Sequence, residues 1–158
     1  MIENYLDILE DSLEKKVTVL EEIATYSCEQ EKLLKQDKFD LEAFDVQVEK
    51  KDELIQKLLK LDEGFELLYD RVREQLQKNK EQYKTQIVHM QQLIAQITDK
   101  NMSIQAQEAR NKKMVEDYFA KEKSAIRTGR QASKAAYDYY RNMNNANQVP
   151  PQYMDQKH

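Results

Sequence analysis

Few residues in this chain of 158 have side chains that could carry out chemistry. Cys28 is the single cysteine, so no internal disulfide forms. It follows Tyr26 and Ser27, with no cluster of cations to lower its pKa, which predicts a half-buried small residue rather than a reactive thiol. His89 has no cysteine or second histidine at ligand spacing, and His158 is the last residue. We therefore expect no metal site and no cofactor.

Catalytic motifs are also missing from the sequence. Carboxylate pairs such as Asp52–Glu53 and Asp62–Glu63 occur at the density of any exposed coiled-coil face. The sequence has no glycine-rich phosphate loop and no glycine-flanked nucleophilic serine. These observations predict a protein that is not an enzyme.

The elements that carry these residues are predicted to be long helices. The chain has two glycines and two prolines, and a third of its residues are charged. A sheet protein of this size needs many turns, which draw on glycine and proline, whereas long helices need few. The commonest residues are mostly good helix formers. The expected fold is all-α, an antiparallel coiled-coil bundle of about three long helices with a C-terminal helical extension.

The first helix is expected over residues 2–35, where apolar residues recur at alternating steps of three and four. At 1.5 Å per residue it would be about 50 Å long, which is typical of a coiled coil. Asp40 is a good N-cap for a second helix that begins at Leu41. Phe39 and Phe44 then occupy the two positions of a hydrophobic staple.

The second helix is expected to end near residue 61, with a corner at 62–65 that contains Gly64 and a third helix over 65–120. The alternative is an unbroken helix, because Phe65, Leu68 and Leu76 continue the same phase. Gly64 inside a helix would cost about 1 kcal/mol relative to alanine.

The C-terminal part differs in charge from the rest of the chain. Residues 1–109 hold 15 Lys and Arg against 24 Asp and Glu, whereas residues 110–141 hold 9 against 4. We expect three parts: a helical bundle over 1–120, a basic C-terminal helix rich in small residues over 121–141, and a disordered Asn/Gln/Pro-rich tail over 142–158. The basic stretch is interpreted as a solvated helix face rather than a nucleic-acid site, because the whole chain is acidic.

Apolar surface remains as the functional signal. If the third helix starts near residue 65, its later part extends beyond the reach of a bundle about 50 Å long. Small residues spaced by four then form a ridge on which another helix could lie closely. This additional apolar surface has three possible uses: it could bind a partner, form a homodimer or fold back onto the bundle. The candidate partner-binding residues are Leu93, Ile97, Ile104, Met114, Val115, Tyr118, Phe119, Ala125, Gly129, Ala132 and Ala136. A chain that ends after Asn111 is expected to keep its bundle and to lose partner affinity.

Compartment follows from what the sequence lacks. Residues 1–11 are acidic and contain no apolar signal-peptide region, and no run approaches the ~18 apolar residues of a membrane span. We therefore expect a cytoplasmic protein that binds neither membrane nor nucleic acid.

Three segments of the sequence carry a family resemblance: Lys35–Leu41 after the first long helix, Glu49–Ile55 in the second, and Ile97–Asn101 with Ile104 and Arg110–Asn111 in the third. In these segments the chain resembles the FlgN-type flagellar export chaperones. The resemblance covers roughly residues 1–120 and is a pattern of heptads and lengths. Residues 121–158 depart from it, including the tyrosine-rich run Ala135–Tyr140.

The resemblance implies a cytosolic chaperone that binds the C-terminal amphipathic helix of a flagellar hook–filament junction protein. Such a chaperone prevents premature assembly of its client and delivers it to the export gate. Two alternatives stay open: a structural or self-assembling coiled-coil adaptor without cargo, and a FliT-like chaperone with another flagellar client.

Overall fold

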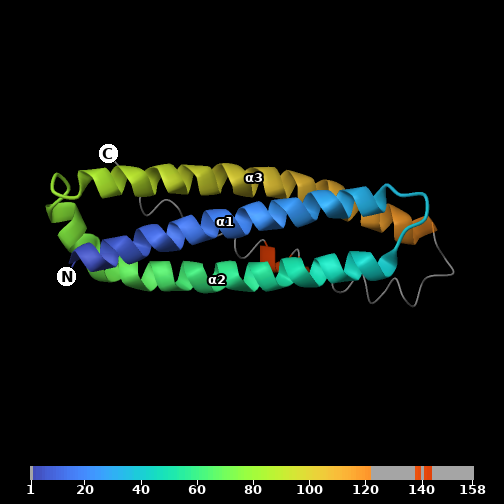
Figure 1. Cartoon of the computed structure of the whole chain (residues 1–158), viewed down its shortest axis with the longest axis horizontal. Helices are drawn as coiled ribbons and strands as arrows, with labels where there is room; N and C mark the ends of the chain where they lie inside the picture. The colour runs from blue at the N-terminus through green and yellow to red at the C-terminus, as the bar shows by residue number, and fades with distance from the viewer. Residues whose placement is uncertain (1, 122–137, 140, 144–158) are drawn as a thin grey trace.

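The computed structural model of the chain describes residues 2–121, 138, 139 and 141–143. The described residues form three long helices and no strand: α1 (Ile2–Leu34), α2 (Leu41–Lys78) and α3 (Lys84–Lys121). The predicted all-helical class is confirmed. Figure 1 shows α2 running back along α1, and α3 running in the direction of α1 along its other side. No described helix combines the length and apolar character needed to cross a membrane.

The first corner lies where the sequence predicts it. Residues 35–40 connect α1 to α2, and the Asp40 carboxylate accepts a hydrogen bond of 3.1 Å from the backbone N–H of Ala43. The ring centroids of Phe39 and Phe44 lie 5.5 Å apart, as the staple requires. Both predicted devices are confirmed.

The second corner was predicted wrongly. Gly64 lies inside α2, which continues to Lys78, and α3 begins at Lys84 rather than near residue 65. The helix ends at Asn79, whose backbone N–H bonds the Gln75 carbonyl at 3.1 Å and whose side-chain amide donates to the same oxygen at 2.8 Å. The apolar phase continues through Gly64, and packing along that seam outweighs the modest helix penalty of one glycine.

The core is a seam along each helix, and α1 is the central element. The Cα atoms of α1 approach those of both α2 and α3, whereas no Cα atom of α2 comes within 8 Å of one in α3. Seam positions hold mostly Leu, Ile, Val and aromatic residues. Seven of the buried positions in the described residues are polar or charged: Lys16, Ser27, Gln30, Lys51, Asp62, Glu108 and Asn111.

Candidate functional site

The predicted partner-binding residues on α3 lie mainly inside the bundle. Leu93, Ile97, Ile104 and Val115 are buried in the core. The expected additional apolar surface depended on a third helix that starts near residue 65, and this start is wrong: α3 begins at Lys84, lies along α1, and its end reaches the connection over residues 35–40. In this packed form these four side chains do not form a surface for a partner.

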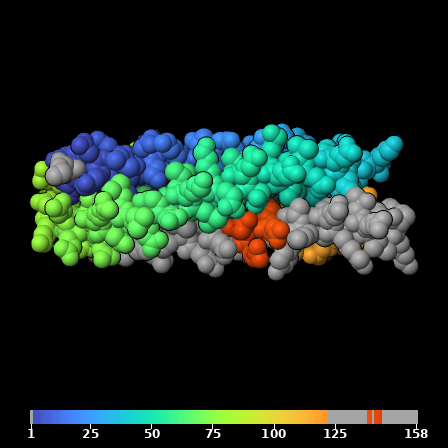
Figure 2. All heavy atoms as spheres, turned by 90° about the horizontal axis from the view of Figure 1, so that it is seen from below, coloured from blue at the N-terminus to red at the C-terminus, as the bar shows by residue number. Residues whose placement is uncertain are grey.

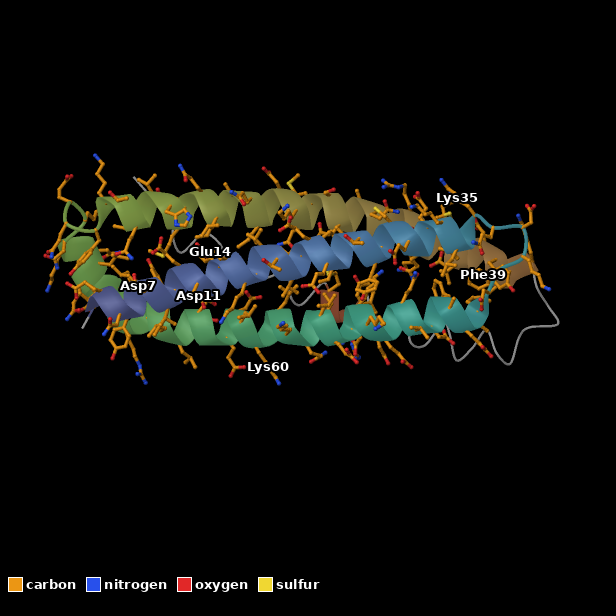
Figure 3. The ribbon with its side chains drawn as sticks, in the orientation of Figure 1. Asp7, Asp11, Glu14, Lys35, Phe39 and Lys60 are labelled. Atoms are coloured by element: carbon orange, nitrogen blue, oxygen red, sulfur yellow. The ribbon has the colours of Figure 1, made fainter. Side chains whose placement is uncertain are left out.

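The aromatic residues near the end of α3 close the bundle at the first corner. The ring of Tyr118 lies 4.4 Å from that of Phe39 and 5.2 Å from that of Phe119, between centroids. Figure 3 labels Phe39 in the connection between α1 and α2. Met114, Tyr118 and Phe119 are half-buried. A chain that ends after Asn111 would lose these contacts, so we now expect its bundle to be less stable than that of the full chain. Ala125, Gly129, Ala132 and Ala136 lie outside the described residues.

The most unusual feature of the core is a buried polar cluster that joins all three helices, which we call the Lys51 layer. It consists of Ser27 and Gln30 on α1, Lys51 on α2, and Glu108 and Asn111 on α3. The Lys51 side chain has no exposed surface. Its ammonium donates to the two carboxylate oxygens of Glu108, at 2.7 and 2.9 Å, and to the amide oxygen of Gln30. These bonds satisfy the three N–H donors of the lysine.

The remaining members complete the hydrogen bonding of the Lys51 layer. Ser27 donates its hydroxyl to Glu108, and Asn111 donates to the backbone carbonyl of Ser27 at 2.9 Å. Gln107 donates to Asn111 at 3.0 Å and to Glu31 at 3.0 Å, which extends the network to the surface. Burial lowers the pKa of Lys51, and the neighbouring Glu108 carboxylate opposes that shift. A fully bonded polar layer of this kind fixes the register of helices.

A short C-terminal segment covers the Lys51 layer. The described members of residues 138–143 are helical, and Tyr139 and Met143 have 1% and 2% of their surface exposed. The Lys51 ammonium lies 4.3 Å from the centroid of the Tyr139 ring, and Asn142 donates to Asp52 at 3.1 Å. We call the site on α2 that this segment covers, which includes Lys51 and Asp52, the C-terminal seat. Figure 2 shows residues 138, 139 and 141–143, in red-orange, against α2 on the side away from α1.

The C-terminal seat corrects the predicted boundary of the disordered tail. Asn142 and Met143 were placed in that tail, yet Met143 is buried and Asn142 bonds α2. The sequence signal was available, because Tyr139 and Met143 are spaced by four and so share a helix face. The tail from residue 144 on lies outside the described residues.

A second polar pair lies between α1 and α2, which we call the Lys16 layer. The Lys16 ammonium donates to one carboxylate oxygen of Asp62 at 2.7 Å, and both side chains are buried. The other Asp62 oxygen is buried without a hydrogen-bond partner. Burial raises the pKa of Asp62, and Lys16 opposes the shift. Asp62 is therefore not one of the exposed carboxylates that the sequence predicted.

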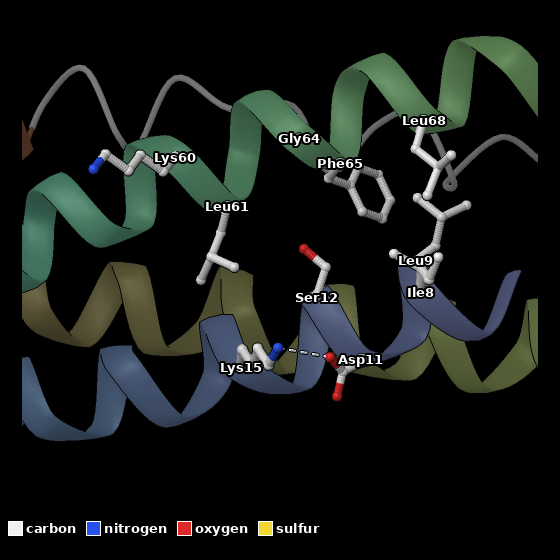
Figure 4. Close-up of a pocket in the computed structure, with 10 residues that line it drawn as sticks. All are labelled: Ile8, Leu9, Asp11, Ser12, Lys15, Lys60, Leu61, Gly64, Phe65 and Leu68. Carbon is white, nitrogen blue, oxygen red and sulfur yellow. Dashed lines mark ion pairs between the residues drawn. The ribbon is translucent and has the colours of Figure 1, made fainter. Parts of the chain in front are cut away.

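A shallow apolar groove adjoins the Lys16 layer. It has a volume of about 230 Å³ between α1 and α2. Figure 4 shows Leu61, Phe65 and Leu68 on α2 facing Ile8, Leu9 and Ser12 on α1. A Cβ atom added to Gly64 would meet nothing within 4 Å. The groove contains no buried polar group placed to orient a ligand, so it is the weaker candidate.

Cys28 and His89, the residues with the most reactive side chains, do not lie together in one site. Cys28 is exposed, not half-buried as predicted. His89 pairs with Glu10 across α3 and α1, at 2.6 Å between ring nitrogen and carboxylate oxygen. Within the described residues, no three His, Cys, Asp or Glu side chains are placed to hold a metal ion.

Comparison with known proteins identified no matching family model, no similar curated protein and no similar solved structure.

Proposed function

We propose that this protein is an export chaperone that binds an amphipathic helix of a partner protein at the C-terminal seat. The partner class that we propose is the C-terminal helix of a flagellar hook–filament junction protein, on the basis of the resemblance in residues 1–120. Delivery to an export gate and action in the cytoplasm belong to the same proposal. We also include in this proposal that the three helices pack along their seams as a coiled coil.

The observation that carries the proposal is the helical segment on Lys51. No Cα atom of α2 comes within 8 Å of one in α3, so the side of α2 that carries Lys51 and Asp52 accepts a further helical segment. Tyr139 and Met143 fill this position with almost complete burial. Partner helices bind other proteins in the same manner, with residues at i and i+4 inserted into a groove.

Reversible release also fits the properties of this position. Tyr139, Asn142 and Met143 make local contacts on one helix turn, and a partner helix that makes the same contacts can replace them. Burial at about 25 cal/mol per Å² supplies affinity, and the loss of the segment's own contacts reduces the net gain.

Isothermal titration tests the proposal directly. A peptide of the last helix of a junction protein is titrated into the full-length chain and into a Tyr139→Ala/Met143→Ala variant. We expect a one-to-one complex with the chain and tighter binding to the variant, whose seat is easier to occupy. A matched Leu67→Ala variant should bind like the unmodified chain, because Leu67 is 64% exposed and remote from the seat in sequence.

The alternatives are outcomes of the same experiments. Binding of a different flagellar client would identify a FliT-like chaperone. No binding, together with a concentration-dependent dimer in analytical ultracentrifugation, would leave a self-assembling coiled-coil adaptor as the better account.

A further inference from the structure

Three residues of the C-terminal segment define a pattern on one helix face. Tyr139, Asn142 and Met143 occupy positions i, i+3 and i+4: Tyr139 covers the Lys51 ammonium, Asn142 donates to Asp52, and Met143 is buried against the core. We infer that the seat selects partner helices with an aromatic residue at i, an uncharged hydrogen-bond donor at i+3 and a flexible apolar residue at i+4. This inference rests on the proposed function, which it deepens by naming the chemistry of the partner.

The aromatic position follows from the state of Lys51. The ammonium has no solvent exposure, and its donors are directed to Glu108 and Gln30. Whatever covers its remaining side needs no hydrogen-bond acceptor but must stabilise a positive charge. The face of an aromatic ring meets both conditions, and an aliphatic side chain meets only the first.

The other two positions follow from Asp52 and from burial. The Asp52 carboxylate accepts a hydrogen bond of 3.1 Å from the Asn142 side-chain amide. An acidic residue at i+3 would instead place a second carboxylate beside Asp52, which is unfavourable. Met143 is 2% exposed and its sulfur lies 4.0 Å from the Tyr139 hydroxyl. A flexible thioether adapts to such a site, and leucine would fill it with less freedom.

The chain's own segment competes with any partner. A tethered segment acts at an effective concentration on the order of millimolar, so a partner with the same contacts must bind more tightly than a free copy of the segment does. The seat of the unmodified chain should therefore reject weak helices and accept only those that present all three features.

The test supplies the segment in trans. The acceptor is the full-length chain with Tyr139→Ala and Met143→Ala, and the probe is a synthetic peptide of residues 131–150 of this chain. We expect the probe to bind this variant and to bind the unmodified chain at least about tenfold more weakly, because the tethered segment competes. A full-length Tyr139→Leu variant, which keeps an apolar side chain, is the second acceptor if the double variant does not fold.

Peptide variants then test each position. Tyr139→Leu should bind about tenfold more weakly than Tyr139→Phe, which keeps the ring face, because only the ring makes the desolvated cation–π contact. Asn142→Asp should also weaken binding about tenfold through like charge. Arg141→Lys is the matched control and should bind like the probe, since Arg141 is 62% exposed and a lysine keeps the charge beside Asp138. Adding Lys51→Met together with Glu108→Leu to the acceptor, so that no unpaired charge is buried, should abolish the preference for Phe over Leu.

Two results would overturn the inference. Equal binding of the Phe and Leu peptides to an acceptor with Lys51 would remove the aromatic requirement. No binding of any peptide to either folded acceptor would show that residues 138–143 are a fixed element of the fold. Failure of the proposed function gives a different result. In that case the peptide variants show the expected preferences at i, i+3 and i+4, yet no junction-protein peptide binds. A junction-protein peptide that binds regardless of Lys51 would leave the function standing and remove the pattern.

Discussion

The Lys51 layer and the Lys16 layer are two solutions to the same problem, a buried lysine paired with a buried carboxylate. In the Lys51 layer the ammonium has three hydrogen-bonded contacts and an aromatic ring, drawn from all three helices and the C-terminal segment. In the Lys16 layer the pair joins α1 to α2 alone, and one Asp62 oxygen has no partner.

The difference shows what each layer can do. A layer whose members come from all three helices can fix the register of the bundle, and it also contacts the segment that occupies the C-terminal seat. A layer between two helices can specify only their alignment. The neighbourhood differs too, because the Lys51 layer is covered by Tyr139 and the Lys16 layer lies beside the open groove at Gly64.

The largest effect is expected from breaking the Lys51 layer. Glu108→Leu leaves the buried lysine without its counter-ion and should lower the free energy of unfolding by about 3–5 kcal/mol. The double variant Lys51→Met/Glu108→Leu should recover most of this loss, because no charge is then buried. Urea denaturation of both variants measures the difference. If the double variant is as unstable as the single one, the loss comes from packing and not from the unpaired charge.

The second-largest loss of stability is expected at the end of the bundle nearest the first corner. Tyr118→Ala removes ring contacts with Phe39 and Phe119 and should lower the free energy of unfolding by about 2 kcal/mol, less than for a fully buried aromatic residue. Thermal unfolding followed by circular dichroism measures it. Leu67→Ala is the exposed control and should change stability by less than about 0.5 kcal/mol. Unchanged stability in Tyr118→Ala, with weaker partner binding, would restore Tyr118 as a partner contact.

A substitution in the open groove beside the Lys16 layer is expected to stabilise the protein. Gly64→Ala should raise the free energy of unfolding by about 1 kcal/mol, since the added methyl group meets no atom within 4 Å and alanine favours the helix. Ala95→Gly, at an exposed position of α3, should lower it by about the same amount. A destabilised Gly64→Ala variant would mean that α2 needs the freedom of glycine at this position.

The smallest effect concerns pH and the Lys16 layer. Burial raises the pKa of Asp62 in the folded chain, so its stabilising contribution is full below the ordinary value of 3.8 and is lost as pH rises through the higher folded value. Asp62→Asn removes this titration. The stability of the unmodified chain minus that of the variant should therefore fall as pH rises above 3.8. Denaturation curves from acid to neutral pH measure this difference. A difference that rises with pH would mean that attraction to Lys16 outweighs burial.

Several features of the fold could be predicted from the sequence because they depend on local chemistry. The three-and-four spacing on α1, the Asp40 cap and the Phe39–Phe44 staple each involve residues within a few turns of one another. The end of α2 could not be placed in this way. Residues 79–83 contain neither glycine nor proline, whereas Gly64 offers a stronger but misleading turn signal.

The candidate site depends on contacts between residues far apart in the chain. Lys51 and Glu108 look like ordinary charged residues in their own segments, and each lies at a seam position that only the packed helices bring together. Tyr139 belongs to the tyrosine-rich run Ala135–Tyr140, and the sequence alone does not indicate that it covers Lys51.

The sequence by itself determined that this protein is built from long helices, because helix propensity, capping and apolar periodicity act over short distances along the chain. Only the tertiary structure decided which polar residues are buried and what covers them. A lysine is placed inside a protein only where several elements supply its partners together, and that requirement is met in space rather than along the sequence.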